Sequence, residues 1–175
     1  MVGLYGLGRR GGGRVGARRV GGAGGASAGD TFWLGLTEEK LGHAEEALAA
    51  YEAALALDRN HWVSANNMAS LLLDRDPERA VALAQRATLA SKMRPETRNT
   101  LGQAFMAAGQ SQDALRVFAS LVQDAPDNAV FAFRHGQALH DAGDTDAARI
   151  ELERALSIDP DFDFASEAKA LLKLN

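Results

Sequence analysis

The sequence predicts an all-α fold built from antiparallel helix pairs, and two observations predict it. The first is the stretch from Pro95 to Asn128, where two short amphipathic segments are separated by Gly109 and closed by Pro126. The second is that the same small and large residues recur about 34 positions before and after this stretch. Recurrence of a helix pair at a fixed spacing indicates a repeat array, in which each pair buries its apolar face against its neighbours.

Apolar spacing defines the two helices of the central stretch. Leu101, Gly102 and Phe105 lie on one helical face, and Gly109 is placed to end the first helix. Ser111 is predicted to be the N-cap of the second helix. The apolar positions of that second helix are Ala114, Leu115, Phe118, Leu121 and Val122. The small residues are expected where two helices cross closely, and the large ones fill the space between turns.

The other copies keep this phase with one exception. In the copy that follows, the equivalent positions are Gly136, Leu139, Gly143, Ala148, Leu152, Ala155 and Pro160. In the first copy they are Leu34, Gly35, Gly42, Ala47, Tyr51 and Ala54. The second copy lacks one residue between its two helices. Its turn at residues 74–77 has no glycine and uses Asp76 as N-cap with Pro77 at the first helical position, a compact connection that fits the deletion.

This pattern resembles the tetratricopeptide repeat, a 34-residue helix-turn-helix unit with small residues at its eighth and twentieth positions and an aromatic residue four positions later. The resemblance covers four copies, at residues 28–61, 62–94, 95–128 and 129–162. It implies a right-handed superhelix of antiparallel helix pairs. Five residues depart from the pattern and are expected to weaken single contacts only: Glu38, Arg59, Ala84, Lys92 and His135. We expect His135 to be a core histidine that makes a hydrogen bond.

Two segments are predicted outside the helix pairs. Residues 1–29 hold 12 of the 18 glycines and five arginines without an acid, so we expect a disordered Gly/Arg-rich tail before a repeat domain at 30–175. A helix at 163–174 is expected to cap the last repeat. Asp30 is predicted to cap the first helix. The other helices are expected at 31–41, 43 or 44 to 57, 62–73, 77–90, 96–108, 112–123, 129–141 and 146–158.

Composition and motifs exclude most chemistry. Without cysteine there is no disulfide, thiolate metal site or cysteine nucleophile. No apolar run approaches the roughly 20 residues of a membrane-spanning helix. The segment from Gly6 to Gly11 satisfies GxGxxG literally but has no strand before it and no helix after it. The four histidines are scattered, and GxSxG and GxxxxGK are absent. We therefore predict no catalytic residue, no metal, no cofactor and no enzymatic activity.

The predicted binding surface follows from the resemblance. In the tetratricopeptide superhelix the first helix of each pair lines a concave groove, which implies that another protein binds there as an extended peptide or a helix. Some of the residues that the resemblance places there are expected to pack between helices instead. The implied groove residues are Phe32, Leu36, Val63, Asn66, Ser70, Leu73, Asn99, Gln103, Met106, Phe133, Gln137 and His140. The charge and amide residues expected of a chaperone-tail clamp are missing except for Asn67, so that subtype is not predicted.

Other functions remain open at this level. Residues 66–72 and 148–172 resemble more loosely the C-terminal part of bacterial tetratricopeptide proteins linked to exopolysaccharide export and surface protein sorting. This favours as an alternative a self-assembling or export-linked envelope subunit, with weak self-association through Phe32 and Trp33. RNA binding by the tail is less favoured, because the tail carries +5 but only Tyr5 for stacking. A cytoplasmic location is expected, or a periplasmic one if the N-terminus is truncated.

Overall fold

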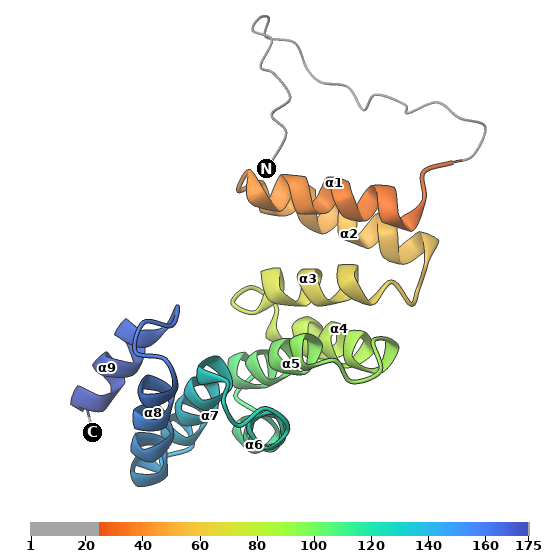
Figure 1. Ribbon diagram of the computed structural model, residues 1–175. Helices are drawn as coiled ribbons and strands as arrows, with labels where there is room; N and C mark the ends of the chain where they lie inside the picture. Colours follow the sequence, from red (N-terminus) through yellow and green to blue (C-terminus); the bar gives the residue numbers. More distant parts are fainter. Residues whose placement is uncertain (1–24, 175) are drawn as a thin grey trace, which may run out of the picture.

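The computed structural model describes residues 25–174, and over that range the chain forms nine helices and no strand (Figure 1). The predicted all-α fold is therefore confirmed. Most of the predicted tail, residues 1–24, lies outside the described range, whereas Ala28 and Gly29 belong to the first helix. The helices are α1 (Ala28–Lys40), α2 (Ala44–Leu57), α3 (Trp62–Leu72), α4 (Pro77–Ala90), α5 (Pro95–Ala107), α6 (Ser111–Asp124), α7 (Ala129–Asp141), α8 (Thr145–Ile158) and α9 (Ala165–Leu174).

Each helix packs on the helices next to it in sequence. The main contacts are within the pairs α1–α2, α3–α4, α5–α6 and α7–α8, and weaker contacts join one pair to the next. The first helices of the two central pairs, α3 and α5, also touch each other. Figure 1 shows the pairs stacked downward from α1 and then turning toward α9, so the array is curved. This order is that of a repeat array stabilised by neighbour contacts.

The core has two parts. The larger runs from α2 to α6, with a contribution from α7, and includes the fully buried side chains of Tyr51, Phe118 and Leu121. The smaller lies among α7, α8, α9 and the segment that leads into α9. In the smaller core the ring of Phe133 stacks on Phe164, with centroids 5.3 Å apart and planes 5° apart, and meets the edge of Phe162 at 5.7 Å. This second core closes the C-terminal end of the array.

The eighth position of each repeat is where the two helices of a pair meet most closely. A Cβ added to Gly102 would lie 2.4 Å from Cζ of Phe118, and one added to Gly35 would lie 2.6 Å from Cε1 of Tyr51. The second repeat has Ala69 there, and its aromatic position is Ala84; both are fully buried. A large partner thus requires glycine, whereas a small partner leaves room for a methyl group.

The way in which the first helix of each pair ends explains why the second repeat can lack one residue. Helices α1, α5 and α7 end with a glycine of positive φ, for example Gly109 at +70°. The next N–H, that of Gln110, donates to the carbonyl of Phe105 at 2.8 Å, which closes a Schellman motif. Helix α3 ends without that motif: the N–H of Asp76 donates to the Leu72 carbonyl at 2.8 Å, and Asp76 Oδ1 accepts from Arg79 N at 3.1 Å. The predicted Asp76 cap is confirmed.

Two predicted caps are wrong. Ser27 rather than Asp30 caps α1, because its Oγ accepts from Asp30 N at 3.1 Å while the Asp30 carboxylate accepts from Ser27 N at 2.9 Å. Asp30 is thus the third residue of a capping box. Ser111 is the first residue of α6, and the N-cap position is Gln110, which has no side-chain cap bond. Helix α9 begins at Ala165, two residues after the predicted start.

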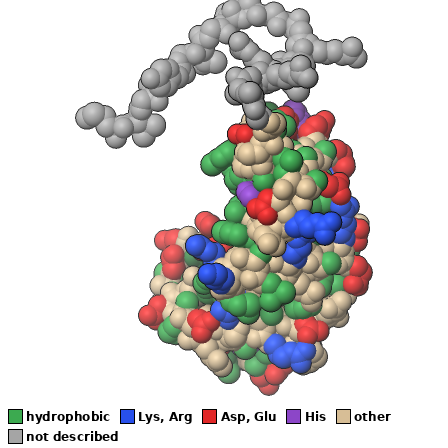
Figure 2. All heavy atoms as spheres, turned by 90° about the vertical axis from the view of Figure 1, so that its right-hand side faces the viewer, with side chains coloured by type: hydrophobic (Ala, Val, Ile, Leu, Met, Phe, Trp, Pro, Cys, Tyr) green, Lys and Arg blue, Asp and Glu red, His purple; other side chains and the backbone are tan. Residues whose placement is uncertain are grey.

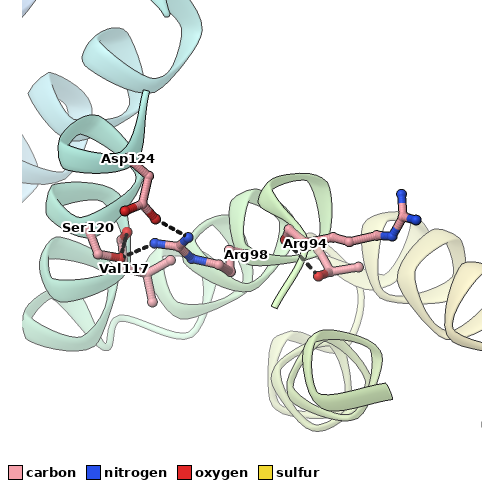
Figure 3. A network of polar contacts seen from close by, with 6 residues as sticks. Arg94, Arg98, Val117, Ser120 and Asp124 are labelled. Carbon is pink, nitrogen blue, oxygen red and sulfur yellow. Dashed lines mark hydrogen bonds and ion pairs between the residues drawn. The ribbon is translucent and has the colours of Figure 1, made fainter. Parts of the chain in front are cut away.

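Two arginines attach α5 to its neighbours on opposite sides (Figure 3). Arg98 points toward α6, where its guanidinium donates to Asp124 Oδ2 at 2.5 Å and to the Ser120 hydroxyl. Arg94, which precedes α5, extends away from Arg98 and lies over the ring of Trp62 at 5.3 Å. The Arg98 side chain is only 11% exposed, so its bonds tie α5 to α6 from a largely buried position.

Candidate protein-binding groove

The predicted groove residues lie on α1, α3, α5 and α7, the first helices of the four pairs, except that Leu73 is the C-cap of α3. Eleven of the twelve are partly or fully exposed. The exception is Phe133, which is fully buried. It was expected in the groove, but the aromatic cluster with Phe162 and Phe164 covers it. The helices that carry the central groove residues, α3 and α5, contact each other, whereas α1 and α7 belong to the first and last pairs.

Asn66 and Asn99 occupy equivalent positions on α3 and α5 and share an unusual state. Each Oδ1 atom is buried and has no hydrogen-bond partner among the described residues. Neither Nδ2 atom donates a hydrogen bond within the same part of the chain, although both residues are partly exposed. An unpaired buried polar atom of this kind costs about 1–3 kcal/mol. The two carboxamides therefore have buried, unpaired oxygens, and their Nδ2 groups remain available as hydrogen-bond donors.

The other polar groove residues are bound more loosely to their own helices. Ser70 is exposed, and its hydroxyl donates to the carbonyl of Asn66 at 3.2 Å. Gln103 donates from Nε2 to the carbonyl of Asn99 at 3.5 Å, the weak end of the hydrogen-bond range. Both side chains can turn outward at little cost, so they extend the polar surface beside the two asparagines.

The apolar groove residues contribute partly to packing. Phe32 lies near Tyr51 and His61, with ring centroids 6.0 Å and 5.5 Å away. Leu73 and Met106 are partly buried and pack against the larger core. Val63 and Leu36 are also half-buried. These side chains therefore contribute to packing between helices and are only partly exposed on the predicted binding surface.

Arg134 is not among the predicted groove residues, yet on α7 it contacts one of them, Gln137. Its guanidinium donates to Gln137 Oε1 at 2.8 Å and lies 4.4 Å above the ring of Phe164. Burial lowers the pKa of Arg134, and the nearby carboxylate of Glu167 opposes that shift. Its Nε atom is buried without a partner in the described structure. The spacing of three residues to Gln137 was a usable signal, because such positions are neighbours on a helix.

A second polar cluster joins α1, α2 and α3. The hydroxyl of Tyr51 donates to Glu39 Oε2 at 2.5 Å and accepts from Asn67 Nδ2 at 3.2 Å. Burial raises the pKa of Tyr51 well above its ordinary value, and the carboxylate of Glu39 acts in the same direction. Asn67, which alone matched the chaperone-tail clamp, is therefore engaged in holding the first two repeats together.

His135 is enclosed as expected, but the expected hydrogen bond is absent. Its Nδ1 lies 3.8 Å from Glu151 Oε1 and has no hydrogen-bond partner among the described residues. Burial lowers the pKa of His135, while the carboxylate of Glu151 opposes the shift. His140, at the far end of the predicted groove, has its Nδ1 3.4 Å from Asp141 Oδ1. The two histidines thus face different carboxylates.

Two other kinds of site are missing from the part of the chain that the structure describes. Within residues 25–174 no three His, Asp or Glu side chains are grouped closely enough to hold a metal ion. Among the helices of that range, none combines the length and apolar character of a membrane span.

Comparison with known proteins defines the class first. The four stacked pairs with a ninth helix form a right-handed α-α superhelix, and models of the tetratricopeptide repeat match residues 31–61 and 99–161. The chain belongs to the tetratricopeptide repeat family. That fold is a scaffold for protein–protein interaction, and the family is generally non-enzymatic.

Three relatives illustrate the similarity. Protein FlbA of Caulobacter vibrioides is 29% identical over 143 residues, which are 81% of this chain; the chain spans about a quarter (24%) of FlbA. MamA from Desulfovibrio magneticus is 16% identical with a TM-score of 0.71, covering 78% of each chain. A thermophilic tetratricopeptide protein of Thermus thermophilus, TTC0263, is 19% identical with a TM-score of 0.68, covering 83% of this chain and 79% of that one. At these identities the two structures establish the fold alone.

Proposed function

We propose that the chain binds a segment of another protein along the first helices of its repeats and holds it without chemical change. The observation that carries the proposal is the unsatisfied pair of carboxamides at Asn66 and Asn99 on the touching helices α3 and α5. A carboxamide offers one acceptor and two donors, which match the C=O and N–H groups of a peptide backbone. The two Nδ2 groups make no hydrogen bond among the described residues and can donate to the carbonyl groups of a bound peptide.

The surrounding residues suit a peptide rather than a small molecule. Ser70 and Gln103 add polar groups beside the asparagines, and Val63 and Met106 add half-buried apolar walls. Either end of a carboxamide can face the groove after a half-turn about χ2. With four repeats the contact area is small, so the affinity is expected in the micromolar range that is common for transient interfaces.

Selection from a displayed library of random peptides tests this proposal. Peptides selected on the full chain should bind the Asn66→Ala/Asn99→Ala variant about tenfold or more weakly, because both backbone-binding groups are lost. Gln112→Ala is the matched control, since Gln112 is an exposed amide residue on α6, the second helix of its pair. Circular dichroism establishes that both variants stay helical. Equal binding by the double variant, or failure to select any peptide, refutes the proposal.

Self-assembly is the second candidate, and the outer face of α1 favours it. Trp33, Leu34 and Leu41 are 64%, 53% and 62% exposed, although residues of this type are usually covered. A second chain that covers this face removes its apolar area from water. Sedimentation equilibrium of residues 25–175 over a wide concentration range, compared with the Trp33→Ser/Leu34→Ser variant, decides the matter. A strict monomer at every concentration rejects self-assembly.

A further inference from the structure

A surface groove between α2 and α4 lies outside the predicted site, because both are second helices of their pairs. From α2 and the turn after it, the groove is lined by Glu52, Leu55, Ala56 and Arg59. From α4 it is lined by Arg79, Ala82, Leu83 and Arg86, and it continues along α4 to Leu89. Met68 of α3 lies between the two helices at its floor. The groove therefore has an apolar floor and a charged rim.

Small side chains lie on both walls of this groove, at the junction between the first and second repeats. Ala56 and Ala82 are both exposed on the walls. At the positions equivalent to Ala82, helix α6 has Arg116 and helix α8 has Ile150, which are larger residues. Leu89 is 75% exposed at the open end of the groove, an unusual exposure for leucine. Apolar area is thus left available along the outer face of α4.

The rim is basic in a repeat domain that is acidic. The lining holds three arginines, Arg59, Arg79 and Arg86, against one carboxylate, that of Glu52. By contrast, residues 30–175 have 14 basic and 23 acidic residues, a formal charge of −9. Figure 2 shows that Lys and Arg side chains gather in separate patches on the face it presents, with acidic side chains around them. The groove is therefore a locally basic surface on an acidic domain.

The three arginines are not equally free. Arg86 donates from Nε to the carbonyl of Arg59 at 2.8 Å, and Arg154 makes the same kind of bond to Pro126 two repeats later, so this role is structural. Arg79 pairs with Glu52 at 2.9 Å, but both side chains are about half or more exposed, and such pairs contribute little. Arg59 makes no ion pair among the described residues, and the neighbouring Asp58 carboxylate accepts instead from Asn60 N at 2.8 Å. Arg59 and Arg79 are the available cations.

We infer that the α2–α4 groove is a second protein-binding surface that receives an acidic amphipathic helix of a partner, with its apolar face on the exposed Ala56, Ala82 and Leu89 and its carboxylates on Arg59 and Arg79. The groove follows α4 from Arg79 to Ala90, about 16 Å at 1.5 Å per residue, which matches three helical turns. A helix laid between two others is the usual way to fill such a space. This site is separate from the one on the first helices, so a partner can occupy each.

A synthetic peptide provides the direct test. The probe is a helix of about 12 residues, stapled because short helices are marginal in water, with leucines along one face and glutamates beside them. Fluorescence anisotropy with the full chain should show binding that weakens about tenfold between about 50 and 300 mM salt, because the charges are on the surface. A peptide with lysine in place of each glutamate should bind about tenfold more weakly or not at all.

Matched variants locate the bound peptide. Ala56→Trp fills the groove and should abolish binding, whereas Ala53→Trp places the same side chain at an exposed alanine of α2 outside the lining and should not. Arg59→Ser/Arg79→Ser should weaken binding about tenfold and remove most of the salt dependence. Retained binding by Ala56→Trp, loss of binding in Asn66→Ala/Asn99→Ala instead, or no preference for the acidic peptide overturns the inference. Association of a second copy of the chain at this groove, seen as dimers that Ala56→Trp dissociates, also overturns it.

Discussion

Glycine at the eighth position of a repeat shows how a single methyl group decides the distance between two helices. Gly102 leaves no room for a Cβ beside the ring of Phe118, whereas Ala69 is accommodated because Ala84 stands opposite. The two positions therefore form one steric unit, and their sizes must be complementary. This unit is what made the repeats detectable in the sequence.

Gly102→Ala is expected to destabilise the chain by about 1–3 kcal/mol, the usual cost of overpacking a core. Phe118→Leu should also destabilise it, but the double variant should be less destabilised than the sum by about 0.5 kcal/mol or more, because the smaller side chain makes room for the methyl group. Urea unfolding of the four proteins measures the coupling. Strict additivity contradicts the steric interpretation.

Lys92 is a residue at which backbone conformation affects stability. It ends α4 at φ +59°, with its N–H donating to Leu89 O at 3.2 Å and that of Met93 donating to Thr88 O at 2.8 Å. This is the geometry that glycine provides after α1, α5 and α7. Lys92→Gly should therefore stabilise the chain by about 0.5–1 kcal/mol, since relief of left-handed strain exceeds the added freedom of the unfolded chain. The midpoint of urea unfolding should rise, while Gly109→Ala should lower it; a lower midpoint for Lys92→Gly contradicts the argument.

Helices are held together by polar contacts of unequal value. Arg98 joins α5 to α6 with its side chain 11% exposed, whereas Arg75 joins Glu45 with the two side chains 47% and 79% exposed. Water screens the second pair, so its contribution is small. In the first pair the arginine is largely buried although Asp124 is 62% exposed, and loss of the arginine leaves the Ser120 hydroxyl and the Asp124 carboxylate without this donor.

Arg98→Met is expected to destabilise the chain by about 1–2 kcal/mol, as for the loss of charge-assisted hydrogen bonds. Arg75→Met should change the free energy of unfolding by less than about 0.5 kcal/mol. Methionine keeps much of the aliphatic volume in both cases. Thermal unfolding of the pair of variants compares them, and equal effects would show that burial does not distinguish these contacts.

The contact between α7 and α8 should depend on pH through His135. Because burial lowers the pKa of His135 in the folded chain, the unfolded chain binds more protons below about pH 6.5. The stability due to neutral His135 is therefore present above that pH and is lost as the pH falls toward the folded pKa. His135→Gln should flatten the fall in melting temperature between about pH 7 and 5. His43→Gln, at an exposed histidine, is the control and should leave the fall unchanged.

At the scale of the repeat array, the two ends of the described part, residues 25–174, differ in how much apolar surface they expose. Phe162, Ala165 and Ala168 are buried against α7 and α8, so α9 covers the last repeat. At the other end Trp33 and Leu34 of α1 and its C-cap Leu41 are exposed to solvent. Repeat arrays need a covered terminal face to remain soluble. The two ends should therefore respond differently to change.

Removal of residues 162–175 is expected to destabilise the chain by several kcal/mol, because it uncovers Phe133 and Leu152. The melting temperature should fall, and size-exclusion chromatography should show aggregation. Trp33→Ser/Leu34→Ser serves as the control, since these side chains are already exposed and should scarcely affect the melting temperature. A truncated chain with an unchanged melting temperature contradicts the capping role of this segment.

The sequence by itself determined the helix pairs and their phase. The reason is that the residues responsible, such as Gly102 and Phe118, meet within one repeat and recur at one spacing, so local pattern and packing agree. The same holds for the Asp76–Pro77 turn. The candidate site was predicted only by position, because nothing periodic marks Asn66 or Asn99 as unpaired.

Only the tertiary structure decided whether a given residue of the candidate site is exposed or buried. Phe133 has the sequence position of a groove residue, yet Phe162 and Phe164 cover it after the chain turns into α9. The groove between α2 and α4 likewise depends on two helices of different repeats whose small residues face one another. Burial results from contacts between segments far apart in the chain, whereas helix periodicity is local. The fold could therefore be predicted from the sequence, whereas the accessible surface follows only from the tertiary structure.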